Sequence, residues 1–143
     1  MGNCNNKIKI EQSIDTVWET IKDFHDMSWA SKIITSVAKV GSKNGHEPGA
    51  KRILNDSFHE TLIKIDCDNY TFSYSIDDGP GPVSNSVIEK YVGVVKLSEY
   101  GSGTLVEWNS VFTSENDNEV TEFCTPIYTA CLQSLKKHLN HSK

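Results

Sequence analysis

The chain has 143 residues, of which 37% are hydrophobic and 23% charged, and its 19 acidic and 14 basic residues give a net charge of −5. This length fits one domain, residues 1–143, and the acidic balance argues against a nucleic-acid partner, because phosphates are bound by basic surfaces. Since no apolar run approaches the roughly 18 residues of a membrane span, we also expect no stable membrane insertion.

The start of the chain and its cysteines indicate a cytoplasmic location. No apolar segment follows a basic start, so the sequence predicts no signal peptide. The cysteines form no CxxC pair, and reduced thiols are their simplest interpretation. They are Cys4, Cys67, Cys124 and Cys131.

The first 30 residues predict one strand followed by two short helices. Ile8 and Ile10 alternate with charged residues, which is typical of a half-buried strand. Ser13 suits the N-terminal cap of a helix, and the apolar residues of 14–21 follow helical spacing. The aromatic, turn-rich stretch 23–30 predicts a second short helix after a tight corner.

From residue 33 to residue 113 the apolar residues recur with a period of two, which is typical of strands. Turn residues and short connections between these strands indicate an antiparallel meander. The Gly- and Pro-rich stretch 78–85 is the long connection, and long loops in compact domains often bind ligands or act as lids. The predicted strands are 33–40, 50–55, 58–66, 70–77, 90–98 and 104–113.

The last segment returns to helical spacing, with an apolar stripe that runs from Val120 to His138. Pro126 lies inside this stripe and removes a backbone hydrogen bond, so we expect a kink there or a helix that begins near Thr125. A sheet with one apolar face needs a cover, and this helix is the element long enough to supply it. The sequence therefore predicts an α+β domain, in which a curved antiparallel sheet of about seven strands wraps around a long C-terminal helix.

Several short motifs carry a resemblance that covers nearly the whole chain. They are Ile14-Asp15-Thr16-Val17-Trp18, Asp23-Phe24 followed by Trp29, Gly49-Ala50-Lys51-Arg52, His59-Glu60-Thr61-Leu62, Tyr74-Ser75-Ile76, Tyr91 and Val106-Glu107-Trp108. In this order they resemble the START or birch-pollen-allergen-like superfamily, in particular its polyketide cyclase/dehydrase and lipid-transport branch. The resemblance implies a helix-grip fold with a cavity between sheet and helix. Members bind lipids, polyketides, plant hormones or other apolar metabolites, and a few are enzymes.

The resemblance also implies which side chains meet a ligand. It puts Arg52 and Glu60 on adjacent strands facing the cavity and Trp29 at the cavity mouth, while Ser86 is the alternative to Tyr91 as an inward-facing residue. The loop before Phe58 is shorter than the lid of the plant hormone receptors, which argues against a receptor-like gate. The ligand-binding candidates are Trp29, Arg52, Glu60, Tyr74, Tyr91, Trp108, Phe123, Ile127, Tyr128 and Cys131.

The residues themselves support part of this set. If Arg52 and Glu60 are both buried they must pair, because an isolated buried charge is very costly. The pair would then orient a ligand carboxylate, carbonyl or hydroxyl, although a structural salt bridge or two exposed charges fit the pattern too. Tyr74, Tyr91 and Tyr128 each carry a hydroxyl that needs a partner when buried, and such rings suit an aromatic ligand.

Catalytic and metal-binding motifs are missing from the sequence, which contains no GxSxG, P-loop, GxGxxG or HExxH. His138 and His141 have a spacing that fits a metal, but no Cys or carboxylate cluster accompanies them, so we expect no metal and no cofactor. Cys131 fits a small core residue better than a nucleophile.

Three hypotheses about function follow. The first is a binding protein for a small hydrophobic or aromatic metabolite, and it leaves the oligomeric state open. The second is a cyclase or dehydratase, with Glu60 or Tyr74 as general acid–base and Arg52 stabilising an enolate. The third is a protein-interaction module, which would expose a large apolar patch and have no cavity.

Overall fold

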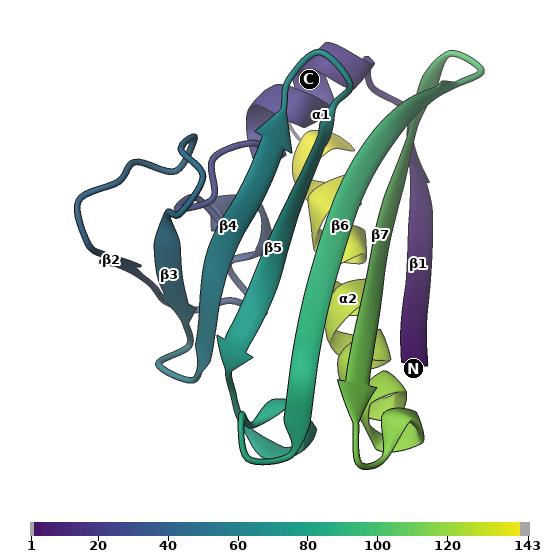
Figure 1. Cartoon of the computed structure of the whole chain (residues 1–143). Coiled ribbons are helices and arrows are strands. Elements are labelled where there is room, and N and C mark those ends of the chain that lie inside the picture. Colours follow the sequence, from purple (N-terminus) through teal and green to yellow (C-terminus); the bar gives the residue numbers. More distant parts are fainter. Residues whose placement is uncertain (1, 141–143) are drawn as a thin grey trace.

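The computed structural model describes residues 2–140. Figure 1 shows a curved sheet that wraps around one long helix, with a shorter helix covering one end of the molecule. The elements are β1 (Gly2–Ile10), α1 (Ile14–Ile21), the 3₁₀ helix η1 (Ser28–Ala30), β2 (Val37–Val40), β3 (Lys51–Leu54), β4 (Phe58–Asp66), β5 (Thr71–Asp78), the 3₁₀ helix η2 (Gly81–Val83), β6 (Ile88–Tyr100), β7 (Gly103–Ser114) and α2 (Asp117–Asn140).

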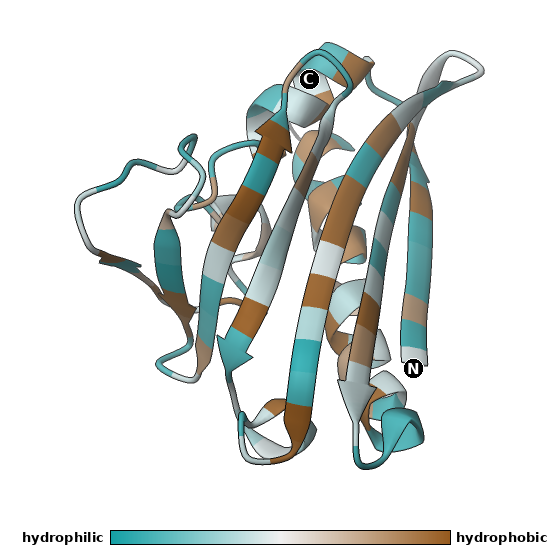
Figure 2. Cartoon of the chain, viewed as in Figure 1, coloured by the Kyte–Doolittle hydropathy of each residue, from teal (hydrophilic) through white to brown (hydrophobic). Residues whose placement is uncertain are grey.

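Within these residues the seven strands form one antiparallel sheet in the order β1-β7-β6-β5-β4-β3-β2. The terminal strand β1 therefore pairs with β7, next to the hairpin that β7 forms with β6. Buried and more exposed residues alternate along β5 and most of β7, whereas β4 has register shifts at His59/Glu60 and Leu62/Lys64. Figure 2 shows hydrophobic and hydrophilic residues interspersed along β4 and β6. The predicted helix-grip fold is confirmed.

Two predicted strands are longer than the observed ones. Residues 33–36 are not part of β2, because the backbone N–H groups of Ile33 and Ile34 continue the turn after η1 by donating to the carbonyl of Ala30. β3 ends at Leu54, since Asn55 and Asp56 adopt φ angles of 54° and 56° and form a turn. The long connection 78–85 contains η2.

The predicted helix start near Thr125 is wrong. α2 begins at Asp117 and continues through Pro126. Pro126 is exposed, and so is Glu122, whose carbonyl would otherwise accept the missing hydrogen bond. Water can therefore replace the absent N–H group, and the helix tolerates proline on its solvent side.

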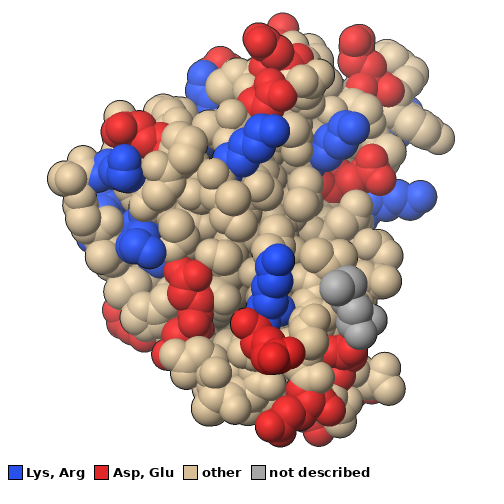
Figure 3. Space-filling view, viewed as in Figure 1, with Lys and Arg blue, Asp and Glu red and all other residues tan. Residues whose placement is uncertain are grey.

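The outer face of the sheet carries acidic and basic side chains interspersed among uncharged ones, as Figure 3 shows. Its exposed large hydrophobic residues are distributed over β2, β4, β6 and β7, and they are Val40, Ile63, Val94, Tyr100 and Val111. No helix within residues 2–140 has the length and apolar character needed to cross a membrane.

Candidate functional site

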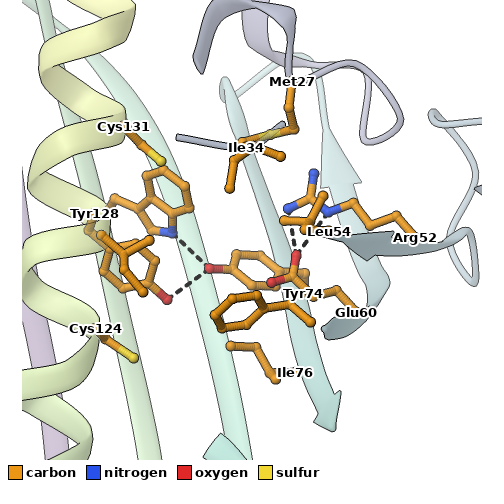
Figure 4. Close-up of a pocket in the computed structure, with 13 residues that line it drawn as sticks. Met27, Ile34, Arg52, Leu54, Glu60, Tyr74, Ile76, Cys124, Tyr128 and Cys131 are labelled. Carbon is orange, nitrogen blue, oxygen red and sulfur yellow. Dashed lines mark hydrogen bonds and ion pairs between the residues drawn. The ribbon is translucent and has the colours of Figure 1, made fainter. Parts of the chain in front are cut away.

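A small cavity lies between the inner face of the sheet and α2, with a volume of about 30 Å³. A space of this size holds about two water molecules. The predicted residues in its wall are Arg52, Glu60, Tyr74, Trp108, Ile127, Tyr128 and Cys131. Figure 4 shows that the strand residues and the helix residues point toward one another across this space.

Arg52 and Glu60 form a buried ion pair in the cavity wall. They are direct cross-strand partners of β3 and β4, and their exposed fractions are 3% and 5%. Nε and Nη2 of Arg52 donate to the same oxygen, Oε1 of Glu60, over 2.8 and 2.6 Å. The guanidinium also donates through Nη1 to the carbonyl of Phe24 at 2.8 Å, and lies 3.8 Å from the centre of its ring.

This geometry leaves the second carboxylate oxygen of Glu60 open. Among residues 2–140 no side chain or backbone group donates to Oε2. Burial raises the pKa of the Glu60 carboxyl above its ordinary value, and the charge of Arg52 works in the opposite direction. A carboxyl with a raised pKa, facing an apolar cavity, can accept a hydrogen bond or exchange a proton there.

Five buried side chains form a chain of hydrogen bonds beside this pair. Trp108 Nε1 donates to the hydroxyl of Tyr74 at 2.9 Å, and the Tyr74 and Tyr128 hydroxyls lie 2.9 Å apart. The hydroxyl of Tyr128 also contacts that of Tyr91, which donates to Ser110 Oγ at 3.0 Å. Burial raises the pKa of all three tyrosines, so they stay protonated and act as hydrogen-bond donors and acceptors.

Gly93 makes room for this arrangement. It pairs with Tyr74 across β5 and β6, and a Cβ atom at this position would lie 2.4 Å from the Tyr74 ring. Any larger residue would therefore push the ring out of its place. The position of the Tyr74 hydroxyl thus depends on a glycine in the neighbouring strand.

Three of the predicted ligand-binding residues lie outside the wall of this cavity. The hydroxyl of Tyr91 contacts that of Tyr128, and the Tyr91 ring stacks on Phe112 with centroids 5.5 Å apart. Phe123 is partly buried, with its ring 6.2 Å from that of Phe58. Trp29 lines a neighbouring cavity of about 10 Å³ and an outer groove instead.

Further wall residues were not among the candidates: Met27, Ile34, Leu54, Phe58, Ile76 and Cys124. Spacing could have found three of them. Leu54 and Ile76 follow Arg52 and Tyr74 by two residues on their strands, and Cys124 precedes Tyr128 by one helical turn. Met27 and Ile34 flank η1, where no period indicates the buried side.

The thiols in the wall are poor nucleophiles. Burial raises the pKa of Cys124 to about 11 and that of Cys131 to about 12, so both remain protonated near neutral pH. His141 lies outside the described residues. Within residues 2–140, no three His, Cys, Asp or Glu side chains lie close enough together to hold a metal ion.

Comparison with known proteins assigns the family. Residues 1–140 match the family of polyketide cyclase / dehydrase and lipid transport proteins, and the chain belongs to this family. It is similar to a protein of known structure from Nitrosospira multiformis, with 36% identity, 94% of each chain covered and a TM-score of 0.91. No curated protein sequence matches the chain.

More distant structures share the fold alone. Ara h 8.0201 has 18% identity and a TM-score of 0.79, with 98% of each chain covered. Major latex-like protein 151 from Panax ginseng has 15% identity and a TM-score of 0.77, with 96% of each chain covered.

Proposed function

We propose that this member of the polyketide cyclase / dehydrase and lipid transport family binds a small hydrophobic or aromatic metabolite between its sheet and α2. The observation that carries the proposal is the open Oε2 oxygen of Glu60, in a wall where the polar groups of Arg52, Tyr74, Trp108 and Tyr128 already have hydrogen-bond partners. Ligand sites combine apolar walls with a few polar groups that fix orientation. Because the bonds of Arg52 are directed at Oε1, the wall offers an acceptor, and a ligand with a hydroxyl group fits it best.

The size of the cavity implies that the walls move when a ligand binds. Small-molecule sites have volumes of roughly 300–1,000 Å³, whereas this cavity has about 30 Å³. Met27 can change its conformation easily because its side chain is unbranched, and Phe58 and Ile127 are only partly buried. The apparent Kd then equals the intrinsic Kd divided by the fraction of molecules that are open before binding, so a small open fraction weakens binding.

The test is thermal unfolding with lipids, flavonoids and polyketides, supported by native mass spectrometry. Flavone and 7-hydroxyflavone form a matched pair that differs in one hydroxyl group. A ligand at 100 times its Kd stabilises the protein by about 2.7 kcal/mol, so the melting temperature rises by several degrees. The proposal fails if no compound raises the melting temperature and none stays bound in the mass spectrometer.

Glu60→Gln tests the anchoring oxygen. Glutamine can still accept from Arg52 through its oxygen, but it presents an amide donor where Oε2 now faces the cavity. We expect 7-hydroxyflavone to bind about 10- to 100-fold more weakly, since a hydrogen bond to a charged group contributes about 1.5–3 kcal/mol. Flavone serves as the control and should bind both proteins equally.

An enzymatic role is the second candidate, and the raised pKa of Glu60 favours it. A carboxyl group with a raised pKa is a better general acid or base near neutral pH. Tyr74 would assist as a donor, and Arg52 would stabilise an enolate through its remaining N–H groups. If a bound compound is converted and Glu60→Gln leaves the rate unchanged, Glu60 has no part in the reaction. Binding without conversion favours the first candidate.

A further inference from the structure

A groove of about 590 Å³ runs along the surface between η1 and the second half of α2. Trp29 and Ile33 contribute its apolar part, while Ser134 and Gln133 of α2 form part of the opposite wall. The hydroxyl of Ser134 donates to the carbonyl of Trp29 at 2.8 Å, which ties the two sides together at the base of the groove. The groove therefore lies directly over Trp29.

Shared wall residues link this groove to the interior cavities. Trp29 lines both the groove and the neighbouring cavity of about 10 Å³. Met27, Arg52 and Trp108 line that cavity and also the cavity of about 30 Å³ that contains Glu60. The groove and the two cavities are thus neighbouring spaces, separated by shared side chains that include Trp29 and Met27.

The buried indole of Trp29 is held by its own segment and by one aromatic neighbour. Its indole N–H donates to the carbonyl of Asp26, which belongs to the same short segment, at 3.2 Å. Its ring lies 6.4 Å from that of Trp108 in a tilted arrangement. The segment contains only the three-residue helix η1 between two irregular stretches, so a small rearrangement there would move Trp29 and Met27 together.

The charged side chains of residues 2–140 that line the groove are two lysines, Lys32 and Lys137. His138 lines it as well, and no carboxylate of these residues does, although the chain as a whole has a net charge of −5. Both lysines are exposed, and within residues 2–140 neither forms an ion pair. The nearby carboxylate of Asp26 accepts a hydrogen bond from the backbone N–H of Ser28 and is not part of the groove wall.

We propose that this groove is the outer part of the binding site, and that it holds the anionic end of an amphiphilic ligand whose apolar body passes Trp29 into the interior. The proposal rests on the proposed function and deepens it by naming the ligand class. The anionic end stays outside because Glu60 already neutralises the charge of Arg52. In the groove, by contrast, Lys32 and Lys137 supply positive charge close to water, where a carboxylate loses little hydration.

Calorimetric titration with decanoate and 1-decanol tests the anionic end, because the two probes differ only in their head group. We expect wild-type protein to bind decanoate more tightly than 1-decanol. In the double variant Lys32→Gln/Lys137→Gln, decanoate should bind about 3- to 10-fold more weakly, while 1-decanol is unaffected. The matched control is Lys64→Gln/Lys90→Gln, which removes the same charge from exposed strand positions.

The outcomes separate the two proposals. In one outcome, both probes bind but the affinity for decanoate falls equally in the two double variants. That result overturns the proposal that the groove binds the anionic end, and it leaves the interior site standing. If 1-decanol binds and decanoate does not, the proposal that the groove binds an anionic end is overturned in the same way. If neither probe binds to wild-type protein while a flavonoid does, the amphiphile is rejected and the proposed function survives.

The access route has its own test. Trp29→Phe shortens the ring between groove and interior, and we expect it to increase the association rate constant of decanoate in stopped-flow measurements. Thermal unfolding of the variant shows whether it is folded, and Trp29→Leu is available if it is not. An unchanged association rate in a folded variant overturns the route past Trp29.

Discussion

The two ends of the core are built from the same sheet and the same helix, but their chemistry differs. At the end covered by α1, the side chains of Ile10, Val17, Leu97 and Leu139 are at most 3% exposed and wholly apolar. The other end buries an ion pair and three tyrosine hydroxyls. The apolar end also buries the Thr104 hydroxyl, which donates to the Gln12 carbonyl, and the indole N–H of Trp18, but no charged side chain of residues 2–140. Packing at the apolar end thus holds α2 on the sheet without an ion pair.

The polar end is therefore not explained by the needs of the fold. Buried ion pairs contribute little to stability compared with apolar residues of similar size. Groups that break the pattern of a core are expected at functional sites. The contrast between the two ends supports the assignment of the Arg52–Glu60 region as the binding site.

The largest expected effect comes from breaking the ion pair. Arg52→Met leaves the Glu60 carboxyl buried without its partner, which costs about 3–5 kcal/mol of the free energy of unfolding. Chemical denaturation of the variant measures this loss. The companion double variant Arg52→Met/Glu60→Leu removes both charges and should recover at least about half of it.

A double variant that is no more stable than the single one would contradict this expectation. It would mean that the contacts of Arg52 with Phe24, rather than its charge, hold this end together. The two ends would then differ less than their composition indicates.

At the apolar end, Leu139→Ala should cost about 2–5 kcal/mol, because it removes buried methyl groups and leaves a cavity. Denaturation measures the loss, and titration with 7-hydroxyflavone measures binding at the other end. We expect the Kd to stay within about twofold of the wild-type value, since distant sites act independently. A large change in Kd would show that the two ends are coupled through α2.

The smallest expected effect is a pH dependence of the free energy of unfolding, which arises from Glu60 at the polar end. Because the folded protein raises the pKa of Glu60 above its ordinary value of 4.5, the folded state binds the proton more tightly than the unfolded chain. The stability contributed by this group is fully present below pH 4.5 and is lost as the pH rises through the raised pKa.

Glu60→Gln removes this dependence. The difference in unfolding free energy between wild type and variant should shift against wild type by up to about 1.4 kcal/mol per pH unit in that window. Denaturation of both proteins between pH 4 and 8 provides the comparison. Parallel curves would show that the pair with Arg52 fully offsets the effect of burial.

Much of the cavity wall could be predicted because strand residues face inward at a period of two. Arg52, Tyr74 and Trp108 were found in this way, with help from the family resemblance. Tyr91 shares the inward period but does not line the cavity; its hydroxyl contacts that of Tyr128, which does line it. Met27 was missed because its segment is irregular and has no period to read.

The sequence by itself determined the order of the elements, the antiparallel sheet and its inward face, since these follow from local spacing and turn residues. Only the tertiary structure decided how large the cavity is and which polar groups meet in it. Tyr74 and Tyr128 are 54 residues apart in sequence, and their hydrogen bond depends on how α2 lies across the sheet. The open oxygen of Glu60, the tolerance of Pro126 and the neighbouring cavity and groove at Trp29 likewise depend on packing between distant segments, which no local pattern encodes.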